Sequence, residues 1–423
     1  MLFSLRGRVQ AAAAVRATEF RGQGTRQCST YCSSRMTPLS TEACPRLTPA
    51  SMWPAIARTY EQAQSSGAAS KTETTFKLVP DEQTGITFVI REASALKKKP
   101  PAPQASQPSQ QVGEQLQGGQ DAGRIAEGGQ QQQARPRKWH DPFLPPEPQL
   151  LVGELSDSHL LVLNKFNVVR HHVLVVTKAF QAQHDPLNAH DLGAVWTVLK
   201  GMSQGRHSGG LAFYNSGEFS GRSQPHKHLQ VVPLPFIDTD TGEGQQQQHG
   251  MPGQHSQDTD GMGPPVEPLV KQAAKASGAA LFEPFPVRQL PYVCYAAMLT
   301  DGSGRDPSPQ ELERTSMELL RQACPNAPIP SSPPPPSAPS SSDPLDLPDS
   351  PPQPPPGAPS YNTIITSQFM LTVPRSAEAA EGIAINALGY AGTILVKSEE
   401  HVAQVEQSGP SNLLRRLGCP WLS

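Results

Sequence analysis

The segment of residues 215–235 constrains the fold of this chain most, because it joins a polar, glycine-bearing loop to a short alternating run. Successive side chains of a β-strand point to opposite faces, so the run predicts a strand with His226, His228 and Gln230 on one face. The intervening Leu229 then faces a hydrophobic core. Two imidazoles and an amide beneath a loop with Gly, Ser, Gln and Arg have the composition of a phosphate site.

A histidine on this strand is a suitable nucleophile toward phosphorus at neutral pH. Its ordinary pKa of about 6.5 leaves most of the imidazole neutral, with a lone pair available. Attack on a phosphate gives a phosphoramidate, which divides one difficult transfer into two easier ones. The Gln230 amide can donate to a phosphoryl oxygen, and the loop N–H groups, with Arg222 and Ser223, can stabilise the developing charge.

Two other readings of the His-x-His pair stay open at this point. Paired histidines on one strand face also bind zinc, copper or nickel, although such a site needs a third ligand. The six cysteines include no CxxC pair, and the chain has no HExxH motif. The third reading is a purely structural pair.

The octapeptide around the histidines resembles the signature of a known family. It reads Ser223-Gln224-Pro225-His226-Lys227-His228-Leu229-Gln230. This is similar to the ATP adenylyltransferases, or diadenosine tetraphosphate (Ap4A) phosphorylases. They are a branch of the histidine-triad (HIT) superfamily, related to galactose-1-phosphate uridylyltransferase, with His-x-His-x-Gln in place of a third histidine. The resemblance implies an α+β, HIT-like antiparallel sheet with flanking helices, and His228 as nucleophile with His226 orienting its ring.

Further matched blocks imply a set of substrate contacts. The segments 159–177 and 360–422 are similar to the family in order. The expected substrate-binding residues are Lys99, Asn164, Lys165, Asn215, Gly221, Arg222, Ser223, Gln224, Gln230, Asn362, Thr366, Met370 and Arg375. Read from the residues alone, Lys99 can belong to a solvated lysine run, Lys165 can be an exposed turn cation, and Arg375 can serve a structural ion pair. The family's Asn-Pro-Phe-Leu-Pro block carries Asp141 in place of asparagine here, which leaves the nearby loops open.

Periodicity predicts the main elements. Helices are expected at 53–64, 185–202, 269–281 and 308–323, the last with a capping-box start at Ser308 and Glu311. Strands are expected at 85–91, 159–169, 172–177, 210–215, 289–297, 361–366 and 369–375.

Composition divides the chain into regions. The expected organisation is a transit or disordered segment at 1–45, an N-terminal catalytic region at 46–237, a low-complexity linker at 238–264 and a C-terminal region at 265–423. The stretches 101–137 and 325–359 are read as disordered inserts, because Gln-, Gly- and Pro-rich sequence buries little apolar surface.

The first 36 residues contain six arginines and one acid, together with an alanine run and serines. This composition is typical of an organellar transit peptide. We therefore expect a chloroplast or mitochondrial protein, and otherwise a cytoplasmic one. The scattered cysteines indicate a reducing compartment. No apolar run approaches membrane-spanning length, and the net charge of −2 argues against nucleic-acid binding.

The resemblance implies phosphorolysis of Ap4A to ADP and ATP through an adenylyl-histidine. The expected partners are small nucleotides and phosphate, with no protein metal site and no tightly bound cofactor, and with Mg²⁺ arriving on the nucleotide phosphates. Two alternatives remain. Sulfate could replace phosphate as acceptor, or the chain could be a catalytically weak nucleotide sensor whose proline tract recruits partners.

Overall fold

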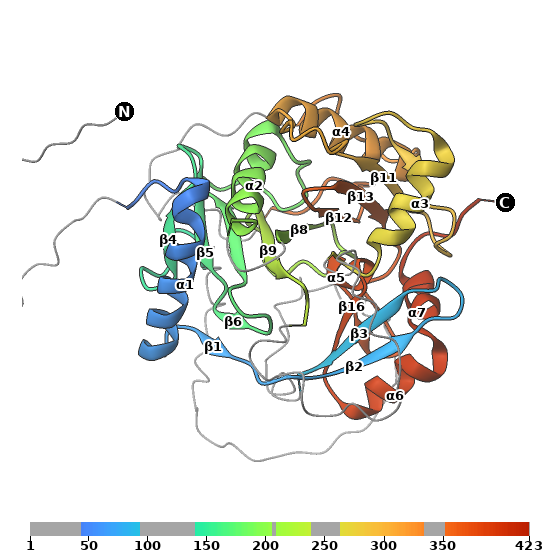
Figure 1. Ribbon diagram of the computed structural model, residues 1–423, viewed down its shortest axis with the longest axis horizontal. Helices are drawn as coiled ribbons and strands as arrows, with labels where there is room; N and C mark the ends of the chain where they lie inside the picture. The colour runs from blue at the N-terminus through green and yellow to red at the C-terminus, as the bar shows by residue number, and fades with distance from the viewer. Residues whose placement is uncertain (1–43, 94–139, 205–208, 238–262, 334–351, 423) are drawn as a thin grey trace, which may run out of the picture. The chain divides into compact units, whose positions relative to one another are not determined.

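The structure is a computed structural model that describes residues 44–93, 140–204, 209–237, 263–333 and 352–422 (Figure 1). Cys44–Ser423 forms one compact unit. The predictions for the first 43 residues, for Lys99 and for the insert 101–137 lie outside the described ranges. No helix in the described ranges is both long and apolar enough to cross a membrane.

A nine-stranded sheet forms the centre of this unit, and every neighbouring pair in it is antiparallel. In spatial order its strands are β10 (Phe285–Pro286), β11 (Tyr295–Met298), β13 (Phe369–Pro374), β12 (Tyr361–Ile365), β8 (Gly209–Ser216), β9 (His228–Leu234), β7 (Val173–Thr177), β5 (His159–Leu163) and β4 (Leu151–Glu154). The predicted α+β fold with an antiparallel sheet is confirmed. The histidine strand β9 is held on both sides, by β8 and β7.

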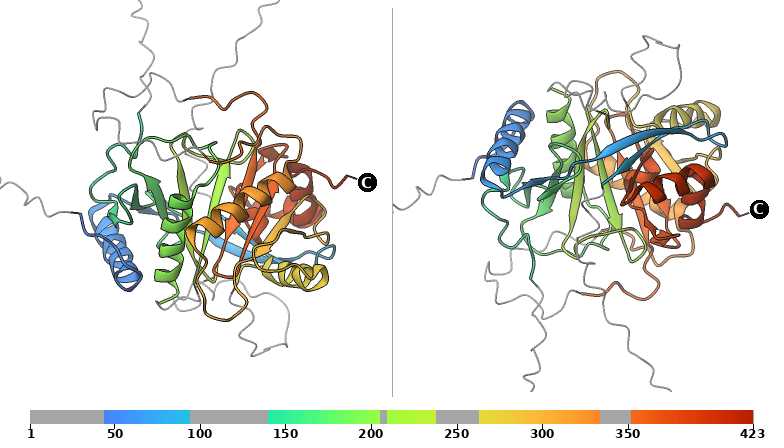
Figure 2. Two further views of the ribbon diagram at one scale, coloured as in Figure 1. Left: turned by 90° about the horizontal axis from the view of Figure 1, so that it is seen from above. Right: turned by 90° about the horizontal axis from the view of Figure 1, so that it is seen from below.

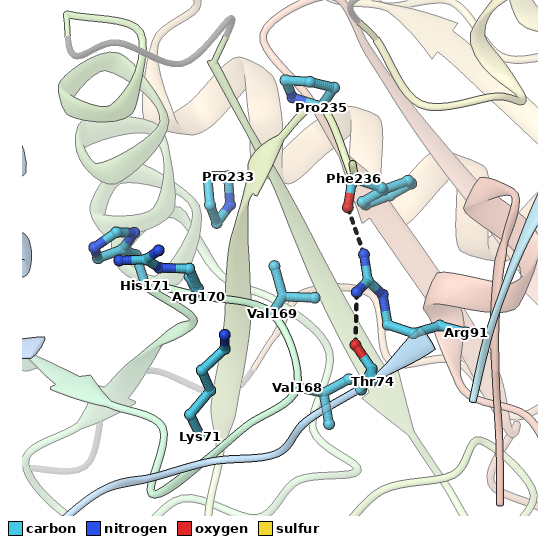
Figure 3. Close-up of a pocket in the computed structure, with 10 residues that line it drawn as sticks. All are labelled: Lys71, Thr74, Arg91, Val168, Val169, Arg170, His171, Pro233, Pro235 and Phe236. Atoms are coloured by element: carbon cyan, nitrogen blue, oxygen red, sulfur yellow. Dashed lines mark hydrogen bonds between the residues drawn. The ribbon is translucent and has the colours of Figure 1, made fainter. Parts of the chain in front are cut away.

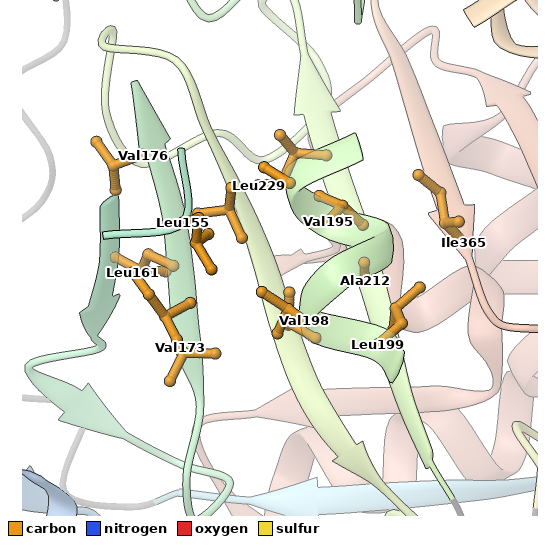
Figure 4. Packing of buried hydrophobic residues seen from close by; sticks show 14 of the residues in the cluster. Leu155, Leu161, Val173, Val176, Val195, Val198, Leu199, Ala212, Leu229 and Ile365 are labelled. Atoms are coloured by element: carbon orange, nitrogen blue, oxygen red, sulfur yellow. The ribbon is translucent and has the colours of Figure 1, made fainter. Parts of the chain in front are cut away.

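Helices α1 (Pro49–Ser66), α2 (Ala189–Met202) and α4 (Pro309–Ala323) cover one face of this sheet (Figures 1 and 2). Helix α2 directs Val195, Val198 and Leu199 at the strands, where they meet Leu229 of β9, as predicted (Figure 4). Helices α1 and α2 pack closely because position 201 is glycine: a Cβ there would lie 2.3 Å from Cβ of Met52.

The other face carries a second hydrophobic core under a three-stranded sheet in the order β16-β3-β2. Its strands are β2 (Thr75–Pro80), β3 (Thr87–Glu92) and β16 (Thr393–Val396), with β16 parallel to β3. Helices α3 (Glu267–Ser277), α5 (Ala387–Ala391), α6 (Glu399–Ser408) and α7 (Pro410–Leu417) add side chains to this core. Two small ribbons complete the structure: β1 (Ser70–Lys71) pairs with β6 (Phe166–Asn167), and β14 (Ala379–Ala380) with β15 (Ile383–Ala384).

The predicted elements appear with shifted ends. The strand expected at 289–297 begins only at Tyr295, and the helix expected at 269–281 ends at Ser277, because Gly278 takes the left-handed conformation that closes it. The capping box of Ser308 and Glu311 is present. The proline-rich stretch predicted at 325–359 lies partly within the described residues. Its described ends, 325–333 and 352–359, are placed, and Ile329 packs against the helix-covered core.

Candidate active site

The ring of His226 is fully buried, and both of its nitrogens are occupied. Nδ1 lies 2.7 Å from Oδ2 of Asp141, and Nε2 lies 2.8 Å from Oγ1 and 2.9 Å from the carbonyl oxygen of Thr177. Asp141 also accepts the N–H of Phe143 at 2.9 Å. The residue at which this chain departs from the family block therefore holds the first histidine in place.

His228 has the geometry of a nucleophile. Its Nδ1–H donates to the carbonyl oxygen of His226 at 2.8 Å, which leaves the Nε2 lone pair free. Burial lowers the pKa of His228 to about 4, although the hydrogen bond to the His226 carbonyl acts in the opposite direction, so the ring is neutral at pH 7. His226 thus orients the His228 ring through its carbonyl group, whereas its own ring faces Asp141 and Thr177.

A further histidine, which the sequence did not single out, lies on the same face. His172 precedes β7 and is buried, and its Nδ1 accepts a hydrogen bond from Nδ2 of Asn164 at 3.0 Å. Its Nε2 has no hydrogen-bond partner in the described part of the chain. Burial lowers the pKa of His172 to about 4, while a contact with the Gln230 amide acts in the opposite direction. Asn164 therefore fixes a neutral imidazole beside Gln230.

Asn215 presents an unused donor next to the histidine strand. Its Oδ1 accepts Nδ2 of Asn362 at 2.8 Å and the N–H of Ala387 at 3.1 Å. With the oxygen so occupied, the Nδ2 group is buried without a partner within the described residues. Strand β12 pairs with β8 so that Asn362 lies opposite Asn215. The substrate contact expected at Asn215 stays a prediction.

Arg375 and Asn362 form hydrogen bonds within the protein, and the substrate contacts expected at them stay predictions. Arg375 is buried, and its guanidinium donates to Oδ1 of Asn362 (2.5 Å) and to the carbonyl oxygens of Ile385 (2.9 Å) and Ala377 (2.8 Å). Asn362 in turn donates to the carbonyl oxygen of Ser220 at 2.9 Å. The polar groups of both residues are therefore used within the protein. Through the bond from Asn362 to Ser220 they support the glycine-bearing loop.

Thr366 and Met370 also lie away from the site. Oγ1 of Thr366 accepts the N–H groups of Gln368 and Phe369, both at 3.1 Å, and so caps the β12–β13 turn. Met370 is fully buried in the core beneath the helices, on the opposite face of the sheet. The substrate contacts expected at these two residues stay predictions.

The loop ahead of β9 carries the remaining expected contacts. Gly221 has φ +77°, and a Cβ there would lie 2.9 Å from the carbonyl oxygen of Ile385. Ser223 is exposed, and Arg222 and Gln224 are half-buried. Arg222 lies close enough to His184 to act on its pKa, which burial chiefly lowers. Lys165 is an exposed turn residue whose Nζ pairs with Glu147 at 2.6 Å.

A separate cleft lies at the other end of β9 (Figure 3). Its lining residues are Lys71, Thr74, Arg91, Val168, Val169, Arg170, His171, Pro233, Pro235 and Phe236. Arg91 is tied to Oγ1 of Thr74 at 2.8 Å and to the carbonyl oxygen of Phe236 at 2.7 Å. At about 3.3 Å per residue along a strand, Pro233 is roughly 16 Å from His228. Another lining residue, His171, immediately precedes His172 of the histidine face. No group of three or more His, Cys, Asp or Glu side chains within the described ranges is placed to hold a metal ion.

Comparison with known proteins assigns the chain to a family. The Ap4A phosphorylase N-terminal domain matches residues 42–118 and 120–243, and the ATP adenylyltransferase C-terminal domain matches residues 288–420. The chain belongs to the Ap4A phosphorylase family. The first match ends at residue 243, the second begins at residue 288, and together they contain every residue of the site described above.

Individual members of this family are similar over most of the chain. Protein APA1 of Saccharomyces cerevisiae is 26% identical over 387 residues, covering 88% of this chain and 95% of that protein. Diadenosine 5',5'''-P1,P4-tetraphosphate phosphorylase 2 of the same yeast is 28% identical over 290 residues, covering 64% of this chain and 73% of that protein. Crystal structures of yeast Ap4A phosphorylase Apa2 in complex with AMP and with Ap4A share the fold. Each is 21% identical with a TM-score of 0.58, and each comparison covers 89% of this chain and 100% of the other.

Proposed function

We propose that this protein is a nucleotidyltransferase that catalyses the reversible phosphorolysis of Ap4A to ADP and ATP. The observation that carries the proposal is the neutral, oriented imidazole of His228 in the His-x-His-x-Gln strand of an Ap4A phosphorylase-family chain. A histidine held in this way needs no external base before it attacks.

In the first step, Nε2 of His228 forms a bond to the α-phosphorus of Ap4A, and the bond from that phosphorus to the bridging oxygen breaks. ATP leaves with this oxygen and its electron pair. The positive charge that develops on the ring is stabilised by the His226 carbonyl oxygen, which accepts the Nδ1–H at 2.8 Å. In the second step, an oxygen of inorganic phosphate attacks the same phosphorus, the P–N bond breaks, and ADP leaves.

Donors around His228 can hold the transferring phosphoryl group. The free Nδ2 of Asn215 lies near the end of β8, the amide of Gln230 lies near the start of β9, and the N–H groups of 221–224 lie in the loop between these strands. Hydrogen-bond donors that are held in position before the reaction stabilise the transition state most where charge develops in it. The adenylyl group therefore binds across the β8–β9 gap, and Arg222 lies in the loop beside it.

Two further properties belong to this proposal and extend beyond the site. Mg²⁺ enters with the nucleotide phosphates, because it prefers phosphate oxygens and water to an all-protein cage. The arginine-rich segment 1–36 directs the protein to an organelle. Deleting 1–36 is expected to leave phosphorolysis intact in vitro and to move the protein to the cytosol in cells; an unchanged location would refute the targeting role.

The test of the function is a two-stage labelling experiment. Ap4A labelled at both α-phosphates is expected to leave an acid-labile, base-stable label on the protein and to release labelled ATP in the absence of phosphate. Adding phosphate should then convert the label to ADP. His228→Ala should abolish labelling, whereas the matched control His190→Ala, an exposed histidine on α2, should retain it. Labelling that survives in His228→Ala would refute the proposal, and sulfate in place of phosphate tests the alternative acceptor.

A further inference from the structure

Every hydrogen-bonding group of Gln183 is used to tie strands β8 and β9 together. Its Oε1 accepts the N–H of His228 at 2.8 Å, and its Nε2 donates to the carbonyl oxygens of Asn215 (3.0 Å) and His228 (3.1 Å). Its own N–H donates to the Pro225 carbonyl at 2.8 Å, and its carbonyl accepts the Tyr214 hydroxyl at 2.6 Å. The side chain is 1% exposed.

The register of the sheet explains why an amide is needed here. The ladder between β8 and β9 runs from Gly209 opposite Leu234 to Phe213 opposite Gln230, where it stops. Two residues further on, Asn215 would lie opposite His228. The main-chain groups that would bond to each other at this point instead bond to the Gln183 amide. The Gln183 amide therefore holds β8 and β9 apart at His228 by about the width of one planar group. The main-chain groups on both strands still have hydrogen-bond partners.

We propose that Gln183 is a positioning residue that sets the distance between the His228 nucleophile and the Asn215 amide donor. This inference rests on the proposed function, since that gap receives the α-phosphoryl group. If the ladder closed, His228 and Asn215 would approach each other and the phosphoryl group would lose its place between them. If the amide were replaced by an apolar group, three main-chain groups would lose their partners and the spacing would no longer be fixed.

The anchoring of the Gln183 loop makes this spacing rigid. The Lys227 N–H donates to the Gln181 carbonyl at 2.8 Å, and the Tyr214 hydroxyl also reaches the Asp185 carbonyl at 2.9 Å. Because the loop is bonded to the strands at several points, the amide cannot shift to follow them. Displacements near 1 Å at a reacting centre cost about 100-fold in rate, so a fixed spacing here matters for catalysis.

The test compares three full-length variants in the first half-reaction, measured as the pre-steady-state release of ATP from Ap4A without phosphate. Gln183→Leu keeps the volume and removes all three amide bonds. Gln183→Glu keeps the acceptor for His228 but turns a second oxygen toward two carbonyl groups. The control is Gln181→Leu, since Gln181 lies in the same loop, is also buried, and has an Oε1 without a partner in the described structure.

We expect Gln183→Leu and Gln183→Glu to slow ATP release by about 100-fold at pH 7.5, with the KM for Ap4A within about 3-fold of wild type. Gln183→Glu should recover on lowering the pH to 5.5, because the protonated carboxyl regains a donor, whereas Gln183→Leu should not. Gln181→Leu should match wild type. We expect wild-type release to change little over this range, because burial lowers the pKa of His228 to about 4.

Three results would overturn the inference. In the first, Gln183→Leu releases ATP at the wild-type rate. In the second, it changes only the KM for Ap4A. In the third, Gln183→Leu and Gln181→Leu slow ATP release equally and lower Tm equally, which would indicate a general weakening of the loop. The wild-type reaction separates this inference from the proposed function. A wild-type protein that forms no adduct refutes the function, and a wild-type adduct formed equally fast by Gln183→Leu refutes only the role of Gln183.

Discussion

Oδ2 of Asp141 lies 2.7 Å from Nδ1 of His226, and both side chains are completely buried. The carbonyl of the same histidine accepts the Nδ1–H of His228, so a single residue connects Asp141 to His228. At the position where the family block resembled by this chain has asparagine, the carboxyl group of Asp141 holds His226. His226 in turn orients the ring of His228.

We expect Asp141→Ala to lower kcat and to destabilise the fold by about 1–3 kcal/mol, because it leaves a buried imidazole N–H without an acceptor. Asp141→Asn should lose much less, since the amide oxygen can still accept that hydrogen. Chemical denaturation and steady-state phosphorolysis measure both effects. Equal losses in the two variants would contradict an acceptor role for Asp141.

Gln230 should decide how the adenylyl intermediate is resolved. A glutamine amide can donate a hydrogen bond but has no useful pKa, whereas histidine can transfer a proton to or from a water molecule. We expect Gln230→His to weaken phosphorolysis and to raise the share of AMP among the products at saturating phosphate. Product chromatography measures that share. If AMP already dominates in the wild type at saturating phosphate, the protein is a hydrolase.

The stability of the fold should depend on pH through His172 and His228. Their pKa values lie at about 4, against about 6.5 in the unfolded chain, so the unfolded chain binds more protons between these values. This contribution to stability is complete above about pH 6.5 and is lost as the pH falls toward 4. Denaturation midpoints between pH 7 and 4.5 measure the slope, which should be shallower in His172→Asn. An unchanged slope in that variant would refute the assignment.

A buried ion pair lies directly behind the nucleophile. Nζ of Lys227 is 2.7 Å from Oδ2 of Asp191, and neither side chain is exposed. Burial favours a raised pKa for Asp191, but Lys227, and then His159, lower it to about 2. We expect Lys227→Met to destabilise the protein by about 3–5 kcal/mol, since it removes the cation paired with a buried carboxylate.

The exposed pair of Lys200 and Asp306, 3.0 Å apart, is the matched control for this ion pair. Lys200→Met should cost no more than about 1 kcal/mol. Urea denaturation at pH 7 compares the two variants. Similar losses for both would show that burial does not determine the contribution of Lys227.

Gly221 should tolerate no side chain. Gly221→Ala meets both the strain of a positive φ and a backbone carbonyl 2.9 Å from the new Cβ, whereas Gly67→Ala, at a similar φ of +76°, enters open space. Gly67→Ala should cost about 1 kcal/mol, and Gly221→Ala should cost more and also reduce kcat by moving the 221–224 loop. Equal effects of the two substitutions on kcat would contradict the close packing of this loop.

The sequence was enough to predict which side chains share a face of β9. It did not reveal the residues that hold the two histidines of this segment in place. Two-residue alternation was enough to place Leu229 in the core, because that rule depends only on the strand itself. The roles of Gln183, Asp141 and His172 depend on which segments meet, and no local pattern contains that information. The face that Met370 takes was likewise out of reach, because it depends on the register of β13 against its neighbours, and a shift of one residue reverses the face.

The pairing of β8 with β12 also has a consequence for the order in which the enzyme is made. Asn215 receives its bond from Asn362, 147 residues later in the chain. On the ribosome, the nucleophile strand therefore emerges long before the strand that completes its neighbour, and β8 remains an open edge until then. Activity appears only when the C-terminal region has been synthesised and has paired with β8, so a nascent chain that already carries both histidines cannot yet consume dinucleotide.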